Sequence, residues 1–253
     1  HQSLLRFLGQ GFEHIPGGLD HLLFLLCLVV PFRRELRSLV LIVTAFTIGH
    51  SITLIASAYG AAPDALWFPA LVETLIAASI FYMAVENVVA PNVKTRWVLA
   101  VGFGLIHGFG FSFGLRNTLQ FAGDHVLTAL LSFNVGIELG QLIVLALLVP
   151  LLNVAFRYVV AERVGVILLS IVVGHTAWHW MMDRGSLLLR FPFPAIDAAG
   201  IAVLLRWLMV IVAAAGVLWL ISGFVKKWEG DEKTEDRRNE TKGVTAPQQQ
   251  SAR

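Results

Sequence analysis

Charged residues are scarce in this chain of 253 residues: only 14% are charged, whereas 57% are hydrophobic. Soluble domains carry about 25% charged residues, and a soluble core of this size could not bury so much apolar surface. The formal net charge is only +2, and much of the charge lies near the C-terminus, which argues against nucleic-acid binding. We therefore expect membrane lipid to be the solvent for much of the chain.

Cysteine is nearly absent as well, since Cys27 is the only one. A single cysteine forms no internal disulfide and provides no C-x-x-C pair for a metal. Any metal site must therefore use nitrogen and oxygen ligands.

What the chain has instead is a series of long apolar runs, and about 20 residues suffice for a helix to cross the hydrocarbon core. The runs lack the period-2 alternation of strands. They predict an all-α, polytopic transmembrane bundle of about seven helices within residues 1–225, followed by a disordered, charged cytoplasmic tail at 226–253. The predicted spans are 16–32, 37–59, 67–90, 97–115, 125–152, 163–182 and 200–225.

Lysine and arginine gather in alternate loops between these spans. Because cytoplasmic loops carry the excess of positive charge, this distribution predicts an N-terminus outside the membrane and a cytoplasmic C-terminus. The loop residues that carry the signal are Arg33, Arg34, Arg37, Lys94, Arg96, Arg157, Arg163, Lys226 and Lys227.

Polar and ionisable residues inside spans are costly and mark functional sites. With the predicted orientation and a rise of about 1.5 Å per residue, nearly all of those in the first six spans fall in the outer half of the bilayer. Imidazole suits Zn, Cu, Fe and Ni, and carboxylates can complete the coordination sphere, so this layer predicts a metal site. Its members are Asp20, His21, His50, Glu73, His107, Asn134, Glu138, His175 and His179.

Other interpretations of single residues stay open. A histidine such as His50 could hydrogen-bond across a helix pair, and Glu73 or Glu138 could be a neutral buried acid or a proton relay. Towards the cytoplasmic side, Glu86 and Asn87 could be an inner step of an ion path or an interfacial pair.

Glycine and proline add local expectations. Pro16 suits the first turn of the first span, which would leave His14 in a lead-in loop that folds back over the site. The i, i+4 glycine pairs at 104/108 and 136/140 predict tight helix contacts.

Four stretches resemble the HupE/UreJ family of membrane proteins. The first has the histidine followed by G-x-D-H that is typical of the family's first span, and the other three agree with later spans. The resemblance covers the first five spans well and is less distinctive afterwards. The stretches are 11–22 (GFEHIPGGLDHL), 46–54 (FTIGHSITL), 103–111 (FGLIHGFGF) and 133–141 (FNVGIELGQ).

The resemblance implies an accessory protein of hydrogenase or urease systems that carries nickel or a related divalent metal across a bacterial inner (plasma) membrane. The family's histidine and Asp-His pair correspond to His14, Asp20 and His21. The chain is most similar to the branch that often has an extracytoplasmic domain, which would precede His1.

Three functions are compatible with these features. A divalent-metal permease would bind its ion, nickel or zinc, at the His/Asp/Glu site and pass it inward. A zinc-dependent intramembrane hydrolase, resembling the alkaline ceramidase type, would hold zinc with His175, His179 and another histidine and use Glu73 or Glu138 as general base. A scaffold would use the polar groups only to lock the bundle. The family resemblance places the permease first.

Overall fold

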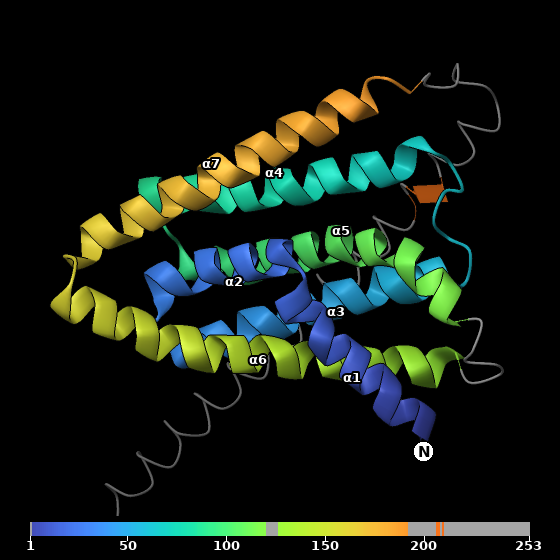
Figure 1. The fold of residues 1–253 in the computed structure, drawn as a ribbon, viewed down its shortest axis with the longest axis horizontal. Coiled ribbons are helices and arrows are strands. Elements are labelled where there is room, and N and C mark those ends of the chain that lie inside the picture. The colour runs from blue at the N-terminus through green and yellow to red at the C-terminus, as the bar shows by residue number, and fades with distance from the viewer. Residues whose placement is uncertain (1, 120–125, 192–205, 208, 210–253) are drawn as a thin grey trace, which may run out of the picture. The chain divides into compact units, whose positions relative to one another are not determined.

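The computed structural model describes residues 2–119, 126–191, 206, 207 and 209. All regular structure in these residues is α-helical, as predicted, and the helices lie within one compact unit, residues 1–192 (Figure 1). In chain order the helices are α1 (Gln2–Gly17), α2 (Leu19–Phe32), α3 (Leu36–Ala58), α4 (Trp67–Val89), α5 (Val93–Leu119), α6 (Val126–Tyr158) and α7 (Glu162–Leu188).

Four of the helices, α3, α4, α6 and α7, are long and apolar enough to cross a membrane, and the bent pair α1–α2 adds a fifth candidate. The predicted span at 97–115 corresponds to α5, which is not among these candidates in the described residues. The predicted span at 200–225 and the tail lie outside the described residues, apart from three positions.

The start of the first predicted span was wrong. Helical structure begins at Gln2, and Pro16 lies in the last turn of α1 rather than in the first turn of a span. His14 is therefore a helical residue and not part of a loop. The break falls at Gly18, whose extended backbone (φ −99°, ψ 107°) cannot continue an α-helix, and α2 leaves α1 at an angle of 69°.

Helix α2 lies inside the bundle and contacts α1, α3, α4, α6 and α7. Cys27, Leu28, Val29 and Val30 are consecutive residues that point in different directions around the helix, yet all four are buried. A helix that is apolar on every side lies either in lipid or among other helices, and here other helices surround it. This packing fixes where the start of α2 presents its polar residues.

Around α2, helix α3 packs on α5, α1 on α6 and α4 on α7 (Figure 1). The predicted close contacts at the glycine pairs are confirmed. A Cβ atom on Gly104 would overlap the Phe46 carbonyl oxygen of α3, and one on Gly136 would overlap the Leu8 carbonyl oxygen of α1. These helix pairs therefore meet backbone to backbone, which is possible only where a side chain is missing.

Gly104 and Gly102 provide a matched test of this packing, because a Cβ atom on Gly102 meets nothing within 4 Å. We expect Gly104→Ala to destabilise the protein by about 1–3 kcal/mol through overpacking, whereas Gly102→Ala should be neutral or stabilising because alanine favours helix. Thermal unfolding of the detergent-solubilised variants measures the difference. Equal melting temperatures for the two variants would contradict the close contact.

Candidate metal centre

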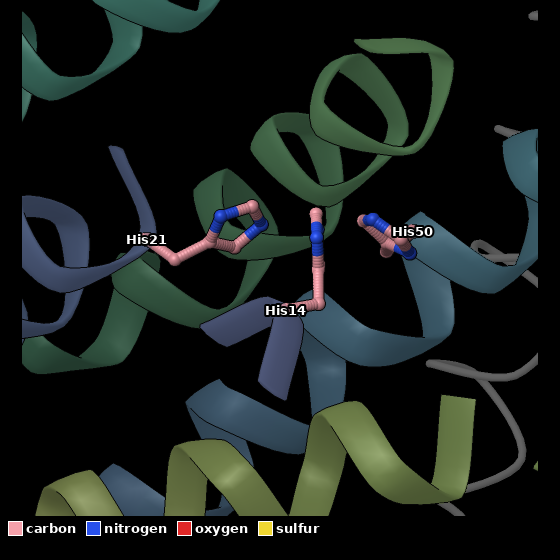
Figure 2. Close-up of side chains that lie close together, drawn as sticks. All are labelled: His14, His21 and His50. Carbon is pink, nitrogen blue, oxygen red and sulfur yellow. The ribbon is translucent and has the colours of Figure 1, made fainter. Parts of the chain in front are cut away.

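Histidines from three different helices meet inside the bundle. His14 of α1, His21 of α2 and His50 of α3 each offer a ring nitrogen, and these atoms lie within 4.8 Å of one another. Figure 2 shows the three rings converging. His107 of α5 adjoins them, with its ring centroid 5.4 Å from that of His21. We call these four residues the histidine cluster.

The bend between α1 and α2 brings the first two members together. His14 and His21 are seven residues apart, which in a straight helix would separate them by about 10 Å along the axis. Across the bend their ring centroids are only 4.7 Å apart. A Cβ atom on Gly18 would lie 2.8 Å from both Asp20 Oδ1 and His21 Nδ1, so glycine provides both the turn and the space for this pair.

Hydrogen bonds to the Nδ1 atoms orient two of the rings. His21 Nδ1 lies 3.1 Å from Asp20 Oδ1, and His107 Nδ1 lies 2.7 Å from the carbonyl oxygen of Phe103. A carbonyl oxygen or a carboxylate can only accept, so Nδ1 carries the proton and donates it. The Nε2 atom of each neutral ring then has a free lone pair, which is the arrangement seen in metal-binding histidines.

His50 is oriented in the same way by an amide. Its Nδ1 lies 3.4 Å from Asn134 Oδ1. The amide of Asn134 is itself oriented, because its Nδ2 donates to the carbonyl oxygen of Leu130 at 2.9 Å. Asn134 was predicted as a metal ligand. In the structure it contacts His50, itself a candidate ligand, and its amide oxygen sets the tautomer of that ring.

The Nε2 atoms of all four cluster histidines are buried, and none has a hydrogen-bond partner among the residues that the structure describes. As whole residues, His21, His50 and His107 are almost fully enclosed, with exposed fractions of 3%, 0% and 1%. A buried polar atom without a partner costs about 1–3 kcal/mol. A cation shared by several lone pairs would satisfy these atoms together, and imidazole nitrogen is the donor that zinc and nickel accept. The residues present thus fit a transition-metal ion.

Side chains with oxygen atoms that could bind a metal lie beside the cluster, along the contact between α3 and α6. Glu138 accepts a hydrogen bond from Thr44 Oγ1 at 2.6 Å, and Thr47 Oγ1 lies 2.5 Å from Glu138 Oε2 and 2.9 Å from Gln141 Oε1. Asn134, Glu138 and Gln141, which are spaced i, i+4 and i+7 on α6, therefore all face α3. The two threonines were missed by the sequence analysis, although their i, i+3 spacing within a predicted span was a signal for them.

Three predicted site residues lie elsewhere. Glu73 of α4 pairs with Arg184 of α7 at 3.1 Å, and their side chains are 44% and 47% exposed. His175 and His179 of α7 approach each other, with ring centroids 4.5 Å apart, but both are exposed. Among the described residues, no third His, Cys, Asp or Glu completes a ligating group with this pair.

Glu86 and Asn87, the predicted inner step or interfacial pair, both contact Arg96. Its guanidinium lies 2.9 Å from Glu86 Oε2 and donates to Asn87 Oδ1 at 2.9 Å, while Asn87 Nδ2 donates to the carbonyl oxygen of Cys27 at 2.8 Å. Arg96 was predicted to lie in a loop, but it belongs to α5 and is only 1% exposed. A buried guanidinium at this point stabilises the carboxylate and repels other cations.

One family model, described as HupE / UreJ protein, matches residues 1–184. The match includes every residue of the histidine cluster and extends beyond the five spans that the four stretches covered. No similar curated protein and no similar solved structure was found.

Asn134 offers a test of the oriented lone pairs. Loss of a hydrogen bond that orients a metal ligand typically costs about 10–100-fold in metal affinity, so we expect a loss of this size for Asn134→Ala. Ser132→Ala is the matched control, because Ser132 lies on the same helix and bonds only the carbonyl oxygen of Thr128. Calorimetric titration of the purified proteins with Ni²⁺ and Zn²⁺ measures both. Equal affinities would show that Asn134 does not orient a ligand.

Proposed function

Because the chain belongs to the HupE/UreJ family and is a multi-pass integral membrane protein, we propose that it is a permease for a divalent transition-metal ion of the nickel type. The observation that carries the proposal is the set of four buried Nε2 atoms that have no partner within the described part of the chain. A polar network with a purely structural role would pair such atoms with one another or with neighbouring groups.

The types of potential ligands favour an ion that is bound reversibly and then released. Next to the nitrogen donors of the cluster, the contact between α3 and α6 provides oxygen donors at Glu138 and Gln141, with Thr47 between them. A structural zinc site is normally closed by four ligands, whereas a row of alternative donors allows an ion to exchange from one to the next. In this proposal the histidine cluster binds the ion first and Glu138 receives it.

The buried arginines at the end of the helices opposite to the histidine cluster support a state in which an ion path would be closed at that end. Arg96 precedes His107 by 11 residues on α5, which is about 16 Å along the helix. Arg33 follows α2, is 3% exposed, and contacts Glu162 at 2.8 Å and Asn153 at 3.0 Å. With the N-terminus outside, as the loop charges predict, the ion would enter near the cluster and the two buried arginines would block the cytoplasmic exit until the helices rearrange.

The hydrolase alternative has less support. It requires a third ligand beside His175 and His179, and among the described residues none lies at ligating distance from the pair. Both carboxylates suggested as its general base are engaged by other groups. Glu73 forms an exposed ion pair with Arg184, and Glu138 accepts hydrogen bonds from threonines of α3. No observation favours it over transport.

Uptake of radioactive nickel, cobalt and zinc by cells with and without the protein tests the permease. We expect His21→Ala and His50→Ala to reduce uptake of the transported metal at least about tenfold, because each removes a ligand. Loss of a residue that only orients a ligand already reduces metal affinity or activity by about this factor. His179→Ala serves as control, since His179 lies outside the cluster and should retain uptake. If the intact protein raises the uptake of none of the three metals, it is not a permease for them.

A further inference from the structure

A cavity of about 160 Å³ lies between α2, α4 and α7 and is lined by Asp20, Glu73, Ile76, Trp180 and Arg184. Asp20 belongs to both this cavity and the metal centre, because its Oδ1 contacts Nδ1 of the buried His21 at 3.1 Å. Its side chain is 26% exposed while that of His21 is 4% exposed. The cavity therefore ends at the residue that orients one of the cluster histidines.

The charges on the cavity wall favour a cation. Two carboxylates, of Asp20 and Glu73, face one guanidinium, of Arg184, so the lining is negative overall when all three are ionised. Glu73 Oε2 and Arg184 Nη1 are 3.1 Å apart, and both side chains are nearly half exposed. An exposed ion pair of this kind adds little to the stability of a fold, so a stronger cation can replace the guanidinium at small cost.

We propose that Asp20 and Glu73 form a capture site for a divalent transition-metal ion. Arg184 stays paired with Glu73 until the arriving ion displaces its guanidinium. This inference rests on the proposed function and adds an entry step to it. A divalent ion neutralises both carboxylates at once, whereas Arg184 neutralises only one. From this site the ion moves past Asp20 to His21, and Arg184 returns to Glu73 behind it.

The position of the ion pair distinguishes it from an ordinary surface pair. Glu73 is on α4 and Arg184 on α7, and Asp20 of α2 completes the wall. The ion pair thus shares its cavity with Asp20, which contacts His21 of the histidine cluster. Capture by opposite charge raises the local concentration of an ion and its rate of association, while the equilibrium affinity of the cluster stays unchanged.

The test compares Glu73→Gln, Arg184→Gln and the double variant with the intact protein, using the rate of Ni²⁺ association in detergent and nickel uptake by cells. For Glu73→Gln we expect association about tenfold slower and KM about tenfold higher, with the equilibrium Kd and the maximal rate unchanged. Arg184→Gln should speed association, and its effect should differ once Glu73 is replaced, because the pair then no longer exists; the double-mutant cycle measures this coupling. Both effects should shrink at high ionic strength.

Asp183→Asn is the matched control, because Asp183 is an exposed neighbour of Arg184 that does not line the cavity. If Glu73→Gln and Arg184→Gln leave association and KM unchanged while His21→Ala abolishes binding, the capture site is refuted and the permease stands. If the intact protein binds Ni²⁺ without transporting it, the permease fails, and the association rates still decide on the capture site. A loss of equilibrium affinity in Glu73→Gln would also overturn the proposal, because it would make Glu73 a ligand of the final site.

Discussion

The bend at Gly18 is the feature on which the metal centre depends. A continuous helix from Gln2 to Phe32 would keep His14 and His21 on separate turns, whereas the 69° angle between α1 and α2 places their rings in contact. Any residue can adopt the extended backbone at this position, but a Cβ atom would press on the side chains of Asp20 and His21, so glycine leaves room for this pair. The other two histidines are added to this pair by the packing of α3 and α5.

The rest of the bundle holds the four rings at fixed orientations. Backbone contacts at Gly104 bring α5, with His107, against α3, with His50. Oxygen atoms of Asp20, Asn134 and Phe103 then bond the Nδ1 atoms. Because each of these oxygens accepts a hydrogen bond from Nδ1–H, the Nε2 atom of the ring keeps its lone pair, and it has no partner among the described residues. Tight packing and tautomer choice thus produce a set of candidate metal ligands.

Charge is divided between the two ends of the helices. The end with the histidine cluster has the carboxylates of Asp20 and Glu73, while the opposite end has the buried guanidiniums of Arg33 and Arg96. At the opposite end each of these guanidiniums is paired with a carboxylate, Arg33 with Glu162 and Arg96 with Glu86. In the proposed permease, these ion pairs would have to change partners before an ion could leave on that side.

The sequence by itself determined the helical membrane fold, the family and the residues able to bind a metal. Long apolar runs are costly in water, and polar side chains within such runs are costly unless they have a function. It could not tell which of these residues meet. His14 appeared to belong to a loop and Gly18 to the first span, since the period of a helix does not reveal a sharp bend between two helical segments. His175 and His179 have ideal spacing on one helix, yet the packing of α7 on α4 leaves them outside the cluster. Only the tertiary structure decides such partnerships, because the contacts join residues far apart in the chain.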